Sequence, residues 1–113
     1  MSKYGNKKTQ MHGIMFDSQR EAARYAQLVI LERMGRIRGL ERQVAYELAP
    51  SVRFEGVKRA KPALKYIADF AYWEGDKRII EDVKSAATEK LAAFRIKMHL
   101  MASVHGLQIR IIK

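Results

Sequence analysis

The chain has 113 residues, of which 48% are hydrophobic and 30% are charged, and this indicates a single soluble globular domain, 1–113, rather than a disordered chain. It contains no cysteine, which excludes disulfides and thiolate chemistry and favours an intracellular, cytoplasmic setting. Lysine and arginine number 22 against 12 acids, and this net charge of +10 favours nucleic acid as a partner over a ribosome-like structural role or an anionic membrane surface.

Residues 1–13 are polar and basic, which predicts a flexible basic arm, with a short strand at "GIMF". The arm has no apolar core of the kind found in a signal peptide. The next stretch, "FDSQREAARYAQLVILERMG", predicts a helix. Ser18 and Glu21 form a capping box, with Phe16 at the position of a hydrophobic staple. The expected apolar stripe contains Ala22, Tyr25, Ala26, Val29, Ile30 and Met34.

Strand signals dominate the middle of the chain. After a turn region, "RIRGLER", the segment "QVAYELA" predicts a strand that Pro50 closes. Residues 51–65 are expected to form a long basic hairpin or loop with Gly56 near its tip. The runs "YIADFAYW" and "RIIEDVK" flank "EGDK", and this pattern is typical of a β-hairpin.

A second helix is expected from Ser85 to Gly106, because apolar residues recur at helical spacing at Leu91, Phe94, Met98, Met101 and Val104. The closing "LQIRII" predicts a last strand that lies parallel to a neighbour through a crossover. The expected order is therefore α-β-β-β-α-β, which is an α/β or α+β fold with a mixed sheet. No apolar run approaches the ~20 residues needed to span a bilayer.

Three polar residues of the expected hairpin point to chemistry. Side chains in a strand alternate between faces, so Asp82 and Lys84 share one face and Glu81 points to the other as an outward-facing charge. Asp69 lies among apolar residues of the partner strand and comes nearly opposite Asp82 when the hairpin closes. A carboxylate is costly to bury there unless it is paired or bound to a cation.

Two carboxylates and a lysine at one place suit a magnesium site. Mg²⁺ prefers hard oxygen ligands and is completed by waters and a substrate phosphate, and Mn²⁺ is expected to substitute for it. The ion polarises a phosphoryl group and activates a water molecule, while the lysine orients that water or offsets negative charge.

Asp69 followed by Asp82-Val83-Lys84 resembles the bipartite signature of the PD-(D/E)XK nuclease superfamily, and the expected order of elements is similar to its restriction-endonuclease-like α-β-β-β-α-β core. The blocks "KYGNKKT", "FDSQREA", "YIADF" and "EDVKS" together resemble a family of small phage and prophage proteins akin to Holliday-junction-resolvase endonucleases. This resemblance covers nearly the whole chain. It departs from the superfamily pattern where Ala68 replaces the proline and Ser85 replaces a frequent glycine.

The resemblance implies that Asp69 and Asp82 are metal ligands and that Lys84 is the catalytic lysine. It also places Glu21 beside the metal, although the capping box alone explains a glutamate at this position. Gln43 begins a strand that leads to the same pocket. Thr88 and Lys97 match helix positions near the scissile phosphate in similar nucleases, although a solvated helix face is the simpler account of Lys97.

Basic residues between the two central strands are the best candidates to bind phosphates, with a mobile solvated loop as the alternative. These residues are Arg53, Lys58, Arg59, Lys61 and Lys65, with Lys3, Lys7 and Lys8 of the arm in support. His12, His99 and His105 are too widely spaced to favour a zinc site, and no glycine-rich nucleotide loop is present.

The sequence therefore predicts a Mg²⁺-dependent, phage-related DNA endonuclease that acts on branched DNA in the host cytoplasm. Because the chain supplies one site and both strands of a junction must be cut, a homodimer is expected. A non-catalytic DNA-binding module with the nuclease fold, and a virion protein that binds DNA through charge, are the alternatives.

Overall fold

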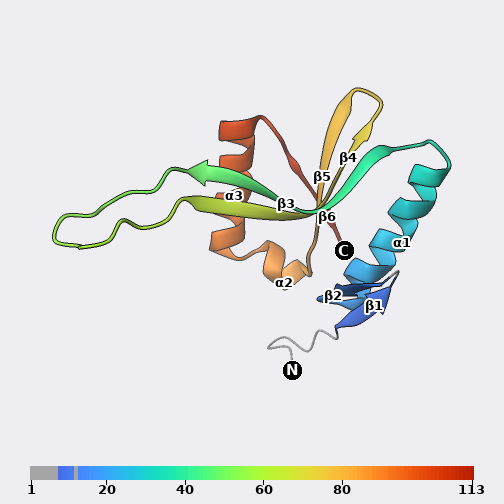
Figure 1. The fold of residues 1–113 in the computed structure, drawn as a ribbon, viewed down its shortest axis with the longest axis horizontal. Helices are drawn as coiled ribbons and strands as arrows, with labels where there is room; N and C mark the ends of the chain where they lie inside the picture. Colours follow the sequence, from blue (N-terminus) through green and yellow to red (C-terminus); the bar gives the residue numbers. More distant parts are fainter. Residues whose placement is uncertain (1–7, 12) are drawn as a thin grey trace.

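Within residues 8–11 and 13–113, which the computed structural model describes, the largest sheet has four strands in the order β3-β4-β5-β6. Neighbours among β3 (Arg38–Ala49), β4 (Leu64–Glu74) and β5 (Lys77–Val83) are antiparallel, and β6 (Ile109–Ile112) lies parallel to β5 (Figure 1). A mixed sheet with helices is the expected α/β arrangement, including the parallel last strand. β3 begins earlier than expected, because residues 38–42 of the expected turn region belong to it.

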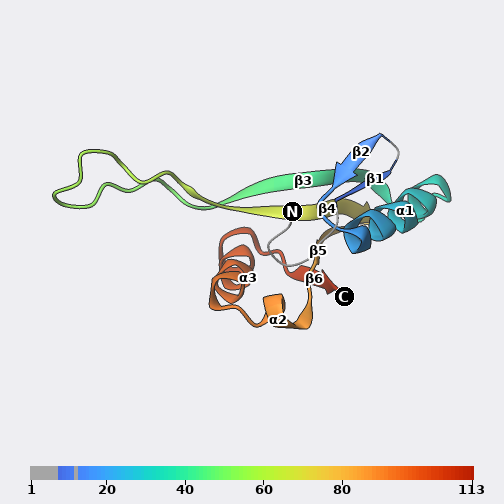
Figure 2. The same cartoon turned by 90° about the horizontal axis from the view of Figure 1, so that it is seen from below.

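Helices and a small hairpin complete the fold. β1 (Thr9–Met11) and β2 (Ile14–Phe16) pair just ahead of α1 (Gln19–Arg33), so part of the expected flexible arm is a strand. Residues 1–7 and 12 of that arm lie outside the described residues. α2 (Ala86–Glu89) and α3 (Ala92–His105) connect β5 to β6 and lie beneath β3 and β4 in Figure 2. None of the described helices is long and apolar enough to cross a membrane.

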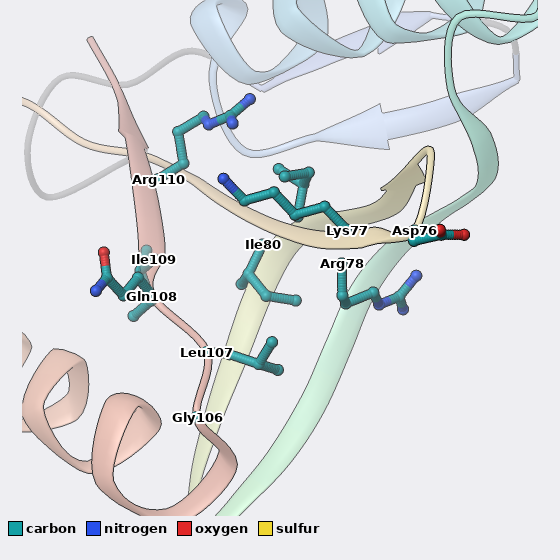
Figure 3. A pocket seen from close by; sticks show the side chains of 10 residues that line it. Asp76, Lys77, Arg78, Ile80, Gly106, Leu107, Gln108, Ile109 and Arg110 are labelled. Carbon is teal, nitrogen blue, oxygen red and sulfur yellow. The ribbon is translucent and has the colours of Figure 1, made fainter.

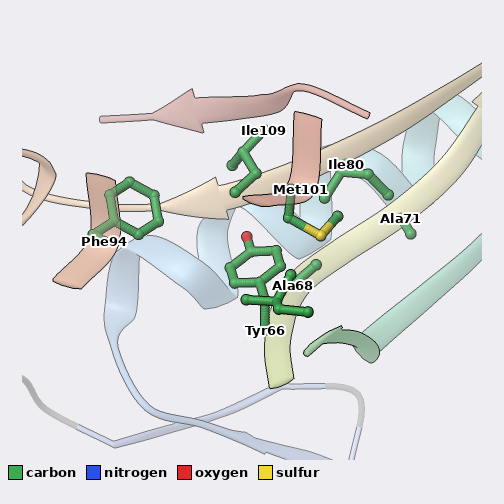
Figure 4. Close-up of a cluster of buried hydrophobic side chains, with 8 residues drawn as sticks. Tyr66, Ala68, Ala71, Ile80, Phe94, Met101 and Ile109 are labelled. Carbon is green, nitrogen blue, oxygen red and sulfur yellow. The ribbon is translucent and has the colours of Figure 1, made fainter. Parts of the chain in front are cut away.

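Two hydrophobic clusters cover the sheet, one for each helical layer. The cluster beneath α3 is shown in Figure 4 and contains Leu48, Tyr66, Ala68, Ala71, Ile80, Phe94, Met101 and Ile109. The cluster beneath α1 contains Phe16, Ala22, Leu28, Ile37, Phe70, Tyr72 and Ile79. Ile79 and Ile80 are neighbours in β5 and enter different clusters, so β5 is buried on both faces.

The start of α1 shows the Ser18 half of the expected capping box, while the side chain of Glu21 accepts a hydrogen bond from Gln43 instead. The backbone N–H of Glu21 donates to the side chain of Ser18, and Phe16 is buried with its ring 5.2 Å from that of Tyr25. The expected stripe is wrong in its C-terminal half, because Ile30 and Met34 are 56% and 59% exposed. The face that packs on the sheet is instead rotated about a quarter of a turn toward Leu28, which is fully buried.

The second expected helix is interrupted. Ser85 caps the short α2, and Leu91 adopts an extended backbone as the residue before α3 begins. Leu91 and Val104 are 54% and 52% exposed, so they do not belong to the buried face. Phe94 and Met101 are buried as expected, because they face the sheet from α3.

Candidate active site

Asp82 and Lys84 lie on the α3 side of β5, as the alternation of side chains predicts. Asp82 is only 2% exposed, and its Oδ2 accepts a hydrogen bond of 3.0 Å from the hydroxyl of Tyr66. The Nζ of Lys84 is 3.7 Å from the same oxygen and 5.2 Å from the centre of the Phe94 ring. Lys84 therefore supplies a positive charge next to a buried carboxylate.

Asp69 lies at an irregularity in β4. Tyr66 and Ala68 belong to the cluster beneath α3, whereas Phe70 belongs to the cluster beneath α1. Residues two apart share one face in a regular strand, so the strand changes face at Asp69. The carboxylate Oδ2 accepts a hydrogen bond of 2.8 Å from the backbone N–H of Val83. This bond holds Asp69 against β5 where the regular register has ended at Phe70 and Glu81.

Glu21 and Gln43 approach from the α1 side. Glu21 is 5% exposed, and its Oε1 accepts a hydrogen bond of 3.2 Å from the Nε2 of Gln43. Gln43 has φ of 53°, a left-handed conformation that is unusual for a residue with a side chain. Strain of this kind concentrates at functional sites, and here it aims the Gln43 amide at Glu21.

The acids of the site are electrostatically coupled. Burial first, and then the hydrogen bond and charge of Asp69, raise the pKa of Asp82 to about 8. Burial, the charge of Asp69 and the charge of Asp17 raise the pKa of Glu21 to about 7. Burial and the adjacent Asp82 also raise the pKa of the Tyr66 hydroxyl, which stays a hydrogen-bond donor. Asp69 thus couples Asp82 to Glu21, while Lys84 and Arg42 offset only part of the negative charge of these acids.

The donor atoms fit a hard divalent cation. Among the residues that the structure describes, no three His, Cys, Asp or Glu side chains are gathered into a ready metal site. Asp69 and Asp82 nevertheless place two carboxylates in contact, and Mg²⁺ is commonly bound through one or two carboxylates plus waters and substrate phosphate. The raised pKa of Asp82 is the response of a buried carboxylate to burial and to a second carboxylate beside it. A ligand role for Glu21 stays a prediction.

A cavity of about 680 Å³ opens beside Lys84, between the start of α1 and α2. Arg20 supplies a cation to its wall. Ser85 and Thr88 supply hydroxyl groups that are bonded to each other at 2.9 Å. A basic side chain and hydroxyl groups next to a carboxylate pair can receive a phosphate group.

Another cavity, of about 700 Å³, lies at the opposite end of β5 (Figure 3). Lys77, Arg78 and Arg110 contribute to its lining, and Asp76 lies at its edge. None of the candidate catalytic residues lines this cavity, whereas Lys84 lines the first one.

The expectation that Glu81 is an outward-facing charge is wrong. Glu81 is fully buried, and Arg24 donates hydrogen bonds of 2.8 and 2.6 Å to its two carboxylate oxygens. The hydroxyl of Tyr72 donates to the same carboxylate. Strand alternation places Glu81 on the α1 face, as expected, but that face is covered by α1.

The expected phosphate-binding lysines and arginines that the structure describes are exposed, and their role stays a prediction. Lys58, Arg59 and Lys61 are exposed on a ribbon beyond the end of the sheet, and Lys65 and Lys97 are exposed on β4 and α3. Lys3, Lys7 and His12 lie outside the described residues.

Tyr66, Arg20 and Arg24 are contributors that sequence reasoning missed. Tyr66 carried a weak signal, since it is a hydroxyl-bearing residue in the same apolar run as Asp69. Arg20 and Arg24 look like ordinary charges of a surface helix, and only the folded chain brings them to the cavity and to Glu81.

The fold and the site define an α/β protein in which a buried aspartate, a half-buried aspartate and a lysine lie together at the central sheet. A protein-family model described as "Protein of unknown function (DUF1064)" matches residues 1–111, and the chain belongs to this family. Searches of curated proteins and of solved structures find no match.

Proposed function

We propose that the protein is a metal-dependent endodeoxyribonuclease of the PD-(D/E)XK type, which hydrolyses phosphodiester bonds. The observation that carries this proposal is the contact of Asp69 with Asp82 beside Lys84, whose Nζ is 3.7 Å from Asp82. A carboxylate pair with an adjacent lysine supplies the groups that metal-assisted phosphodiester hydrolysis requires. The net charge of +10 supports DNA as the polyanionic substrate.

Asp69 and Asp82 would hold the divalent cation, Mg²⁺ or Mn²⁺, which activates a water molecule and offsets charge on the phosphate. Lys84 orients the attacking water or accepts its proton. Tyr66 fixes Asp82 through a hydrogen bond of 3.0 Å. Arg20 lines the adjacent cavity and holds a phosphate of the bound strand there.

The arrangement of elements supports the more specific class. α1 precedes three antiparallel neighbours, and helices then lead to a parallel β6, in keeping with a restriction-endonuclease-like core. The proposal includes a phage-related role on branched DNA, in the host cytoplasm. It also includes a homodimer, because one chain supplies one site for two strands.

Cleavage of defined DNA substrates tests the function. Purified protein is incubated with four-way junction, flap, single-stranded and linear duplex DNA in Mg²⁺, Mn²⁺ or chelator. We expect metal-dependent cuts, strongest on branched DNA. Asp82→Asn should reduce the cleavage rate at least about 100-fold while DNA binding persists. Asp76→Asn is the matched control, because Asp76 is an exposed acid in the turn of the same hairpin.

Full activity of Asp82→Asn would overturn the assignment of the site. Binding that is indifferent to metal, with no cleavage of any substrate, would favour a non-catalytic DNA-binding module instead. Salt-sensitive binding without preference for any DNA structure would favour a protein that binds DNA through charge alone. Analytical ultracentrifugation of the protein with a junction tests the dimer, and paired cuts by a monomer would contradict it.

A further inference from the structure

Residues 50–63 form a ribbon that projects far beyond the end of β3 and β4 (Figures 1 and 2). One bridge joins its two arms, with backbone hydrogen bonds of 3.1 and 2.6 Å between Val52 and Lys61. At the tip, the N–H of Val57 donates to the carbonyl of Phe54 at 3.2 Å. The radius of gyration is 16.1 Å, against roughly 13 Å for a compact chain of this length.

This ribbon exposes apolar side chains at its bridge and its tip. Val52, Phe54 and Val57 are 46%, 58% and 37% exposed, and neither hydrophobic cluster of the sheet includes them. An isolated two-stranded ribbon is only marginally stable in water, and exposed phenylalanine and valine do not stabilise it. Their burial therefore requires a partner that meets the tip.

The charges of the ribbon indicate the chemistry of that partner. The ribbon contains four cations, Arg53, Lys58, Arg59 and Lys61, and one acid, Glu55. Arg53 bonds to the carbonyl of Val57 at 3.1 Å, which places its guanidinium beside the apolar tip. None of the ion pairs found among the described residues uses these cations. An exposed aromatic ring on the same ribbon as cations that form no ion pair within the described part of the chain fits nucleic acid, because phosphates can bind the cations and bases can stack on the ring.

We propose that the ribbon is a wedge for branched DNA, in which Phe54 stacks on an unpaired or unstacked base while the neighbouring cations hold the flanking phosphates. This inference rests on the proposed function for its choice of DNA as partner. A two-stranded ribbon fits the major groove, which is about 12 Å wide. In intact duplex the bases are already stacked, so the insertion of a ring must first separate them. At a branch point the bases are already separated, so the wedge should bind branched DNA more tightly than intact duplex.

The ribbon is also placed to serve the carboxylate site. Its two arms continue directly into β3 and β4, which carry Gln43 and Asp69. A DNA arm that lies along these strands therefore meets the cations of the ribbon and the candidate active site together. Asp69 follows Phe54 by 15 residues, so the two lie at most about 50 Å apart.

Binding in chelator tests the wedge without any cleavage. Dissociation constants are measured for a four-way junction and for a linear duplex of the same arm sequence. Phe54→Ala should weaken junction binding about 10-fold and change duplex binding less than about two-fold, because the loss is one stacking contact. Phe54→Trp should keep the preference. Ile96→Ala is the control, since Ile96 is 59% exposed on α3 and should change neither constant.

A fluorescent base analogue, 2-aminopurine, at the branch point provides a direct readout. Its emission should change when wild-type protein binds and should not change with Phe54→Ala. Equal losses on junction and duplex, or no loss on either, would overturn the wedge. A Phe54→Ala variant that alters only the oligomeric state would overturn it in favour of contact between two copies. Binding is measured in chelator and cleavage in Mg²⁺ or Mn²⁺, so the two proposals can fail separately. Phe54-dependent junction binding by a protein that cuts no substrate with either metal would refute the nuclease proposal and leave the wedge intact.

Discussion

The guanidinium of Arg24 on α1 binds both carboxylate oxygens of Glu81 on β5, at 2.8 and 2.6 Å. Glu81 is fully buried, and Tyr72 donates a further hydrogen bond to it. Glu21 lies one helical turn before Arg24, and Asp82 directly follows Glu81. The ion pair therefore fixes the distance between the acids that α1 and β5 bring to the candidate site, although it lies on the opposite face of the sheet from Asp82.

Loss of Arg24 should be strongly destabilising. In Arg24→Ala the charge of Glu81 stays buried without its partner, so the free energy of unfolding should fall by about 3–5 kcal/mol. Urea denaturation monitored by circular dichroism measures this change. Glu41→Ala is the control, because Glu41 is exposed and its pair with Arg78, at 3.4 Å, should contribute less than about 1 kcal/mol. Similar decreases in the free energy of unfolding in the two variants would show that the buried pair stabilises the fold no more than the exposed pair does.

The stability of the metal-free protein should depend on pH. The pKa of Asp82 is about 8 in the folded chain against 3.8 for the free side chain, and that of Glu21 is about 7 against 4.5. Between these values the folded state binds more protons than the unfolded state, so the free energy of unfolding falls as pH rises from about 4 to about 8. The loss should be at least about 2 kcal/mol, measured by urea denaturation in chelator.

Asp82→Asn is the informative variant for this pH dependence, since an amide cannot titrate. Its stability should decline less steeply over the same pH range and should exceed that of the wild type at pH 8. A parallel decline in both proteins would mean that Asp82 is not the group responsible.

Divalent cations should recover the stability that is lost at high pH. A cation that binds only the folded state stabilises it by about 2.7 kcal/mol at 100 times its dissociation constant. Mg²⁺, Mn²⁺ or Ca²⁺ should therefore raise Tm by several degrees at pH 8 and much less at pH 5, where protons compete for Asp82. Asp82→Asn should abolish this rise in Tm and Asp76→Asn should preserve it. An equal rise in both variants would place the bound cation elsewhere.

Local rules were enough to predict the parts of the site that share one element or one hairpin. The alternation of side chains correctly separated Asp82 and Lys84 from Glu81, and the capping pattern placed Ser18 at the start of α1. The fate of Glu81 was not predictable, because its partner Arg24 is 57 residues away and only tertiary packing joins them. The role of Tyr66 was not predictable for a related reason. The change of face of β4 at Asp69 decides which cluster each residue of the strand joins.

Gln43 offers a test of whether backbone strain serves the site. Its φ of 53° favours glycine, so Gln43→Gly should leave stability unchanged or raise it by up to about 1 kcal/mol. The same change removes the hydrogen bond of 3.2 Å that lowers the pKa of Glu21. If Glu21 acts as an anion, the cleavage rate should fall and its rise with pH should shift to higher pH. Asparagine keeps an amide and tolerates a positive φ, so the pH–rate profile of Gln43→Asn should lie between those of the wild type and Gln43→Gly. Identical pH–rate profiles for all three proteins would show that Gln43 has no role in catalysis.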